Sequence, residues 1–182
     1  MLSEEQISEI RAHLEKAQNP LFFFDNDNDG LSSFLLLRRY IDRGKGVAIK
    51  SFPDLNVTYF RRVEELNPDY VFILDKPQVS KEFIKRVKQA NIPIVWIDHH
   101  NVEVVKDFDI FYYNPVFENG SYEPVSYISY KITNKKEDYG LLLLGALVIV
   151  IYLIFTMNLK KNILNLQKKI LQALFQFFIL LK

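Results

Sequence analysis

Five short apolar runs, separated by segments of helical periodicity, constrain the fold of this chain more than any other feature of its sequence. The runs are rich in aromatic and β-branched residues, as strands are, and polar or turn-forming residues bound each one. They are Leu21–Phe24, Val47–Ile49, Tyr70–Leu74, Ile92–Ile97 and Ile110–Tyr113. Strands that alternate with helices predict an α/β fold, with a mostly parallel sheet of about five strands and helices on both faces.

The helical segments between these runs are amphipathic. The first should open with a capping box between Ser3 and Gln6, and it places Ile7, Ile10 and Leu14 on one face. The predicted helices are Glu4–Ala17, Leu31–Asp42, Tyr59–Leu66, Lys81–Gln89 and Pro124–Thr133. A parallel sheet covered in this way places its ligand site beyond the carboxyl ends of the strands.

The composition excludes several functional classes. The 182 residues include 23 Lys or Arg, 22 Asp or Glu and no Cys. This length suffices for one domain with a sizeable core, and the near-neutral charge leaves no basic tail for nucleic acid. Without cysteine there is no disulfide scaffold, zinc ribbon or thiol nucleophile. The N-terminus does not resemble a signal peptide, so we expect an intracellular, cytoplasmic protein.

The composition changes abruptly near residue 138. All 22 acidic residues and all seven prolines precede residue 139, whereas residues 139–182 carry only lysines as charged side chains. A stretch of this length without Asp, Glu, Arg or Pro is unusual for a globular protein. We therefore divide the chain into a domain at residues 1–138 and an atypical apolar tail at residues 139–182.

Acidic residues follow the first predicted strand directly. Asp25, Asp27 and Asp29 alternate with Asn residues before Gly30, and three such carboxylates repel one another unless cations offset their charge. Hard divalent ions take oxygen ligands of this kind. A calcium-binding EF-hand loop does not fit, because it needs a preceding helix and a Glu where this sequence has Leu36. A solvated Asx-rich turn is the alternative.

Two further strands end in side chains of the same type. The strand Tyr70–Leu74 is followed by Asp75, and the strand that ends at Ile97 is followed by Asp98-His99-His100. Because the carboxyl ends of parallel strands share one edge, these groups should converge there. Imidazole beside carboxylate suits Mn²⁺, Fe²⁺ or Zn²⁺ better than Ca²⁺.

Together these motifs resemble the DHH phosphoesterase superfamily. Its motifs I, II and III are matched by Asp27-Asn28-Asp29-Gly30-Leu31-Ser32-Ser33, by Asp75 and by Asp98-His99-His100. The superfamily includes RecJ-type exonucleases, oligoribonucleases, cyclic-dinucleotide phosphodiesterases and family II pyrophosphatases. Two segments, Leu74–Ser80 and Asn119–Tyr127, resemble its archaeal RecJ-like branch most closely.

The resemblance implies a hydrolytic site with two metal ions, usually Mn²⁺ and with Mg²⁺ as an alternative. Carried over by position, Asp25 and Asp27 would bind one ion, Asp29 and His99 would bind the other, and Asp75 would bridge them. Two such ions clamp a phosphate and lower the pKa of a water between them. No protein nucleophile is then needed.

The same resemblance assigns residues to the substrate. His100 would face the substrate phosphate and Asp98 would orient a histidine, which makes these two the expected catalytic residues. Ser32 and Ser33, in the first turn of the following helix, join His100 as expected substrate-binding residues. The implied substrate is single-stranded nucleic acid or a short oligonucleotide.

One part of the family pattern is missing. Motif IV requires an Asp after a Leu-rich helix, and here Gly145 closes such a segment but no acidic residue follows. We likewise expect this sequence to lack the second domain that holds the substrate in this family. One hypothesis is a frameshift from about residue 140 onward, because codons can be chosen for residues 148–166 whose shifted frame restores Asp, Pro and Glu. The alternatives are a membrane span within residues 140–157, flanked by lysines, and a buried helix native to this protein.

Three functional hypotheses follow. The first is a metal-dependent phosphodiesterase, of exonuclease type, whose activity in this chain is impaired by the missing acid. The second is a non-catalytic remnant that keeps the fold and one metal. The third is a membrane-tethered phosphodiesterase for cyclic dinucleotides.

Overall fold

The computed structural model describes residues 1–102 and 109–145. The chain divides into two compact units, Met1–Ala146 and Leu147–Lys182. The expected frameshifted, membrane-spanning or buried segment lies almost wholly outside the described residues. Within the described ranges, no helix is long and apolar enough to cross a bilayer.

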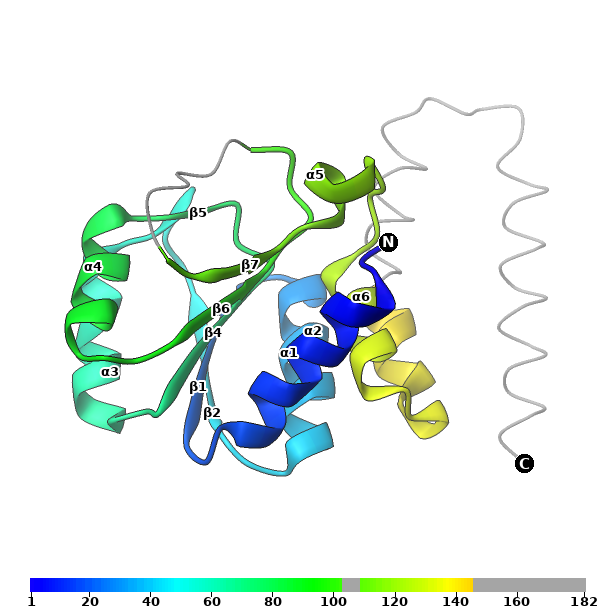
Figure 1. Cartoon of the computed structure of the whole chain (residues 1–182), viewed down its shortest axis with the longest axis horizontal. Coiled ribbons are helices and arrows are strands. Elements are labelled where there is room, and N and C mark those ends of the chain that lie inside the picture. The colour runs from blue at the N-terminus through cyan, green and yellow to red at the C-terminus, as the bar shows by residue number, and fades with distance from the viewer. Residues whose placement is uncertain (103–108, 146–182) are drawn as a thin grey trace. The chain divides into compact units, whose positions relative to one another are not determined.

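A five-stranded parallel sheet forms the centre of the first unit (Figure 1). The strand order is β2-β1-β4-β6-β7, and every neighbouring pair is parallel. The strands are β1 (Pro20–Asp25), β2 (Lys45–Ile49), β4 (Tyr70–Leu74), β6 (Ile94–Ile97) and β7 (Phe111–Tyr113). All five predicted strands are therefore present, and the predicted α/β class is confirmed.

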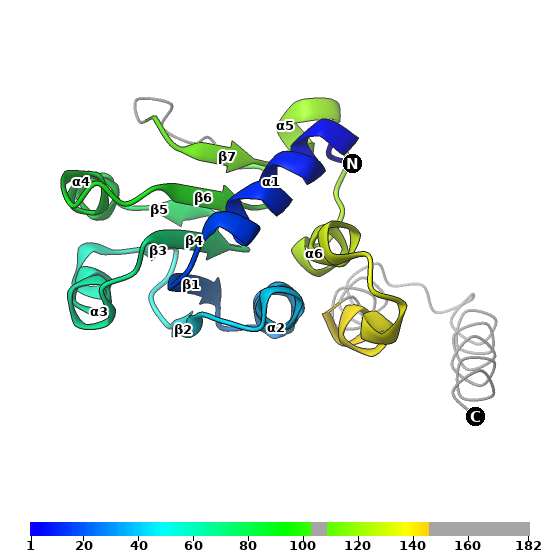
Figure 2. The same cartoon turned by 60° about the horizontal axis from the view of Figure 1, so that its bottom comes forward.

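Helices cover both faces of the sheet, as Figure 2 shows. One face carries α1 (Glu4–Lys16), α2 (Asn28–Ile41) and α6 (Val125–Thr133); the other carries α3 (Phe60–Leu66) and α4 (Lys81–Gln89). Strand side chains alternate between two cores: Phe22 and Phe24 pack with α1, α2 and α6, whereas Leu21 and Phe23 pack with α3 and α4. Burial on both sides explains why the strands read as continuous apolar runs.

Short elements escaped the sequence analysis. A second parallel pair joins β3 (Asp54–Leu55) to β5 (Gln78–Val79), and a short helix, α5 (Pro115–Asn119), follows β7. Two 3₁₀ turns lie at Val57–Tyr59 and Lys136–Asp138. These elements are too short to show a periodicity.

Capping chemistry gave the start of α1 correctly, but the predicted start of α2 was wrong. The expected capping box of α1 is present, with Ser3 and Gln6 bonded reciprocally. Helix α2 begins at Asn28 rather than at Leu31, because the Asp27 side chain accepts a hydrogen bond from the Gly30 amide and caps the helix earlier.

Candidate metal centre

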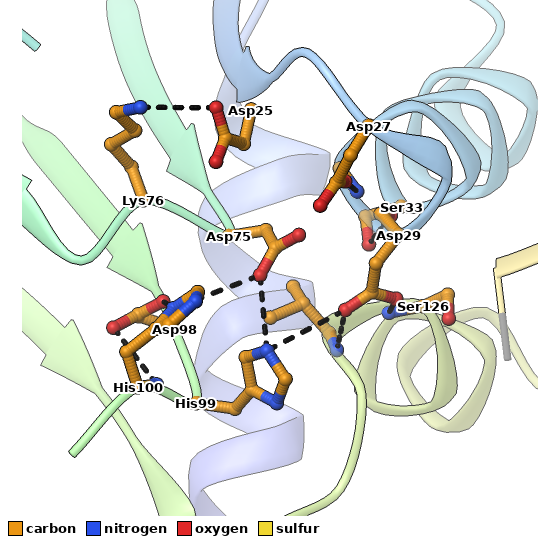
Figure 3. A network of polar contacts seen from close by, with 12 residues as sticks. Asp25, Asp27, Asp29, Ser33, Asp75, Lys76, Asp98, His99, His100 and Ser126 are labelled. Atoms are coloured by element: carbon orange, nitrogen blue, oxygen red, sulfur yellow. Dashed lines mark hydrogen bonds and ion pairs between the residues drawn. The ribbon is translucent and has the colours of Figure 1, made fainter. Parts of the chain in front are cut away.

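Acidic residues and histidines meet at the carboxyl edge of the sheet (Figure 3). Asp25 ends β1, Asp75 follows β4 and Asp98 follows β6, which are adjacent strands. Two backbone hydrogen bonds extend the ladder past the strand ends, from Asp75 N to Ile97 O at 2.9 Å and from Asp98 N to Tyr113 O at 3.0 Å. The backbone at this edge is therefore held by the sheet.

Asp75 is the buried centre of the cluster. Its side chain is 2 % exposed, and its φ of 58° lies in the left-handed region. The Oδ1 atom is buried and has no hydrogen-bond partner within the described part of the chain. Burial raises the pKa of Asp75 well above its usual value, and the negative charges of Asp29 and Asp27 raise it further. A bound cation would relieve this unfavourable buried charge.

Both histidines approach the Asp75 carboxylate. His99 Nε2 lies 3.2 Å from Asp75 Oδ1, and His100 Nδ1 lies 3.9 Å from the same oxygen. One ligand atom from each of the three residues lies within 4.8 Å of the others. This set combines imidazole and carboxylate, as the sequence predicts, and its dimensions fit a divalent metal ion.

The two histidines differ in what else they contact. His100 Nδ1 lies 2.7 Å from Asp98 Oδ1, and the His100 amide donates to Asp98 Oδ2 at 3.2 Å. The hydrogen bond to Asp98 is the main cause of the raised pKa of His100. Asn114 Nδ2 donates to the His100 carbonyl at 3.0 Å. His100 is thus fixed through Nδ1 and leaves Nε2 for another molecule, whereas His99 directs Nε2 at Asp75.

Asp25 already has a protein cation beside it. Lys76 Nζ lies 3.0 Å from Asp25 Oδ1 and donates to the Ser51 carbonyl at 2.9 Å, although the lysine is only 1 % exposed. The Trp96 indole donates to the Lys76 carbonyl at 2.9 Å and holds this segment in place. The sequence analysis did not identify Lys76 as a residue of the site. Its position directly after Asp75 could have indicated that it lies close to the acidic residues.

Asp27, the N-cap of α2, and Gly30, in the first turn of α2, shape the connection from β1 into this helix. Asp27 Oδ1 accepts from the Gly30 amide at 2.9 Å, as the N-cap of α2. A Cβ at Gly30 would overlap the backbone carbonyl of Asp25, so only glycine fits this close approach. The side chains of Asp25, Asp27 and Asp29, which lie at the end of β1 and the start of α2, point in different directions (Figure 3).

Asp29 connects the site to α6. Its two carboxylate oxygens accept from the backbone amides of Val125 and Ser126, each at 2.8 Å. Asp29 Oδ2 also lies 3.9 Å from His99 Nε2, beside the cluster. Burial raises the pKa of Asp29, while the hydrogen bonds from Ser126 and Val125 oppose this shift. Asp29 thus anchors the first turn of α6, a role that the sequence analysis did not foresee.

The two serines expected at the substrate are buried. Ser33 is fully buried, and its hydroxyl donates to the Asp29 carbonyl at 2.6 Å. Ser32 is 4 % exposed, and its Cβ lies 3.1 Å from the place where a Cβ on Gly145 would stand. Both serines are thus buried residues of α2, and their role at the substrate stays a prediction.

Gly145 belongs to a helical stretch at residues 139–145 that passes close to the site. A side chain at this position would overlap that of Ser126, so the glycine permits close contact with α6. The position expected to carry the acid of motif IV lies beyond the described residues.

The structure therefore brings together most of the predicted site. Asp75, His99, His100 and Asp98 form one cluster, and Asp29 lies at its margin. Asp25 and Asp27 surround the cluster but fall outside the compact group of ligand atoms. The direct partners of these two, Lys76 and the Gly30 amide, belong to the protein itself.

Comparisons with known proteins agree with this fold. A manganese-bound exonuclease RecJ has a similar fold, with a TM-score of 0.61 and 14 % identity over 72 % of this chain and 37 % of that one. RecJ from Thermus thermophilus, in complex with Mn²⁺, gives a TM-score of 0.59 and 14 % identity over 72 % and 20 %. This chain thus spans well under half of either protein. A search of curated proteins finds no match. The family model "DHH family, N-terminal domain" matches residues 21–175, and the chain therefore belongs to the DHH family.

Proposed function

We propose that this protein is a metal-dependent phosphoesterase whose substrate is single-stranded nucleic acid or a short oligonucleotide. The observation that carries this proposal is the buried Oδ1 atom of Asp75, which lacks a hydrogen bond and faces two histidines. A buried carboxylate without a hydrogen bond is costly unless a cation binds it. Membership of the DHH family and the resemblance to its RecJ-like branch favour a phosphoester as substrate.

The donor set fits Mn²⁺, with Mg²⁺ as the second choice. Asp25, Asp27 and Asp75 would hold one ion, and Asp29, Asp75 and His99 would hold the other. When bound, divalent ions offset the charge of a phosphate and lower the pKa of a water molecule. We expect the ion held by Asp29, Asp75 and His99 to bind much more weakly, because no acidic residue follows Asp138 in the sequence to supply its fourth ligand.

His100 and Asp98 supply proton chemistry from the protein itself. Asp98 holds His100 Nδ1, so Nε2 is the atom that can reach a substrate oxygen. The raised pKa of His100 keeps a proton on the ring over a wider pH range. His100 Nε2 would therefore donate to a phosphate oxygen, and Asp98 would stabilise the charged ring.

The nucleic-acid substrate and the archaeal RecJ-like assignment rest on resemblance. A cytoplasmic location is a separate proposal that rests on the sequence alone. The state of the tail is a separate proposal: if residues from about 140 onward are frameshifted, activity is impaired in this chain. The family match crosses residue 139 and so includes part of the tail. Sequencing the gene decides this point, because codons that cannot restore acidic residues in another frame would end the hypothesis.

Metal titration tests the proposal directly. Isothermal titration of the purified chain with Mn²⁺ should show one tight and one weak site, and Asp75→Asn should abolish the tight one. Asp109→Asn is the matched control, because Asp109 is a fully exposed aspartate whose partner is Lys88. Slow Mn²⁺-dependent cleavage of a labelled single-stranded oligonucleotide should be lost in Asp75→Asn alone. Equal cleavage by both variants would refute the proposed function.

A further inference from the structure

Phe52 is unusual because a large apolar side chain is held almost completely in water. It is 83 % exposed, more than any other large apolar side chain in the described residues. It follows β2 at the carboxyl edge of the sheet, the same edge that carries Asp75 and the two histidines. An exposed aromatic ring contributes nothing to the core, and one face of the Phe52 ring is open to another molecule.

The backbone that carries Phe52 is fixed on both sides. Lys76 Nζ donates to the Ser51 carbonyl at 2.9 Å, and the Ser51 hydroxyl donates to the Asp54 carbonyl. After the loop, β3 pairs with β5, and the Ser80 amide donates to the Leu55 carbonyl at 3.0 Å. The ring therefore stands on an ordered loop, which lowers the entropy lost when a ligand stacks on it.

One cation links Phe52 to the site. Lys76 Nζ lies 5.7 Å from the centre of the Phe52 ring and 3.0 Å from Asp25 Oδ1. The ring is thus separated from a proposed metal ligand by a single ammonium group. A molecule whose phosphate reaches the metal centre could place the adjoining group on this ring.

The surface beside the loop is cationic. Lys50 is exposed, and its backbone amide donates to the Tyr59 hydroxyl at 2.7 Å. Tyr59 in turn lines a hollow of about 240 Å³ together with Thr58, Arg61 and Arg62, and both arginines also pair with Glu65 at 2.7 Å. Proteins that bind single strands combine such cations with aromatic rings on which bases stack.

We propose that Phe52 is the stacking platform for the nucleobase next to the scissile phosphate. This inference rests on the proposed function and deepens it, because it specifies a nucleobase-bearing phosphodiester rather than pyrophosphate or polyphosphate. Phe52 selects the substrate by offering one face of its ring to the base, while the exposed cations near β2 contact the phosphates that follow. Dinucleotides and longer single strands share this chemistry.

Binding of oligonucleotides to the full chain tests the platform. We would measure fluorescence anisotropy with a labelled, phosphorothioate-protected single strand, and compare the wild-type chain with Phe52→Leu and Phe52→Trp. Phe52→Leu should weaken binding about tenfold, because one base stacked on an aromatic ring contributes roughly this much. Phe52→Trp should bind at least as tightly as the wild type. Phe117→Ala is the matched control, since Phe117 is also exposed but follows β7, the edge strand farthest from β2 in the sheet.

The substrate supplies the second half of the test. A strand with abasic residues at its end should bind the wild type and Phe52→Leu equally, because the stacking partner is missing from both complexes. If a single base occupies the platform, Phe52→Leu should also bind a dinucleotide more weakly than the wild type does. Comparing the loss of affinity for the dinucleotide with that for the longer strand shows which of these two ligands stacks on Phe52. Fluorescence of Trp96, the only tryptophan in the chain, checks that Phe52→Leu and Phe117→Ala are folded, and circular dichroism checks Phe52→Trp, which has a second tryptophan.

The possible failures are distinguishable. If Phe52→Leu binds the intact strand as tightly as the wild type, or loses the same affinity for intact and abasic strands, the stacking platform is wrong. If Asp75→Asn leaves Mn²⁺ binding and hydrolysis unchanged, the proposed phosphoesterase function is wrong whatever Phe52 does.

Discussion

The carboxyl ends of β1 and β4 carry the same kind of side chain but use it differently. The carboxylates after β1 all have partners within the protein: Lys76 for Asp25, the Gly30 amide for Asp27, and two α6 amides for Asp29. The Asp75 carboxylate after β4 is buried more deeply than Asp25 or Asp27, yet its Oδ1 accepts no hydrogen bond from the described residues.

This difference separates structural from functional carboxylates within one cluster. A carboxylate bonded by amides or an ammonium stabilises the fold, and its removal leaves buried donors without an acceptor. A buried carboxylate that lacks such partners destabilises the fold until a ligand binds. Substitutions at the two strand ends should therefore have opposite effects on stability.

The largest effect is expected for Asp75→Asn. The Mn²⁺ affinity should fall by more than about 100-fold, because even residues that only orient a metal ligand cost roughly 10- to 100-fold when lost. Without metal, the variant should unfold at a higher temperature than the wild type. Asparagine also tolerates the left-handed backbone at this position.

The sign of this stability change follows from the raised pKa of Asp75. The unfolded chain loses the proton more easily, so the folded state loses stability as pH rises above the ordinary value of 3.8 and up to the folded pKa. Thermal unfolding in EDTA at pH 4 and pH 7 checks this, since the advantage of the variant should appear only at pH 7. If Asp75→Asn were less stable than the wild type at pH 7, Asp75 would stabilise the fold just as the carboxylates after β1 do, and the proposed difference would be wrong.

Asp29→Ala should have the opposite effect on stability. Two buried amides at the start of α6 would lose their acceptor, and each such loss costs about 1–3 kcal/mol. Urea unfolding should show a lower free energy of unfolding with or without Mn²⁺. Ser33→Ala is the control in the same helix and should change stability little. If Asp29→Ala were as stable as the wild type, the anchoring of α6 by this carboxylate would be disproved.

Lys76→Met tests the partner of Asp25. The variant should lose about 2 kcal/mol, less than for a fully buried pair, because the Asp25 side chain is 23 % exposed. Added Mn²⁺ should recover more stability in this variant than in the wild type, since the ion can replace the missing ammonium beside Asp25. Thermal unfolding with and without Mn²⁺ measures both effects. An equal metal-induced shift in the two proteins would show that Asp25 contacts no ion.

The fold was largely predictable from the sequence, because burial on both faces makes each strand a continuous apolar run. The strand Tyr70–Leu74 and the helix Lys81–Gln89 have the predicted bounds. The pair β3–β5 was missed, since two-residue strands depend on tertiary contacts and carry no periodicity of their own.

The site was predictable in its residues but not in its internal bonds. Asp75 and His99 could be located because parallel strands end at one edge. The hydrogen bonds from α6 to Asp29 join residues almost one hundred positions apart in the sequence. Likewise, no local pattern shows that Lys76 turns its ammonium toward Asp25 rather than to solvent. Such long-range polar contacts require the structure.

The smallest effect is expected for the pair of Asp98 and His100. Their hydrogen bond raises the pKa of His100 above its ordinary value of 6.5. The stability that this pair contributes is therefore fully present below pH 6.5 and is lost as pH rises through the folded pKa. Because the His100 side chain is 38 % exposed, solvent screening should limit this contribution to less than about 1 kcal/mol.

Asp98→Asn should reduce this pH dependence in the metal-free protein. Urea unfolding in EDTA at pH 6 and pH 9 gives the difference for each protein, and that difference cancels any loss of packing that does not depend on pH. His100→Gln should flatten the dependence to the same extent, and the double variant should add nothing, because both substitutions remove one interaction. If Asp98→Asn kept the full wild-type difference while His100→Gln lost it, another carboxylate, such as Asp75 at 3.9 Å, would be the partner of the His100 proton. Asp75 would then have a partner within the protein, and it would no longer differ in this respect from the carboxylates after β1.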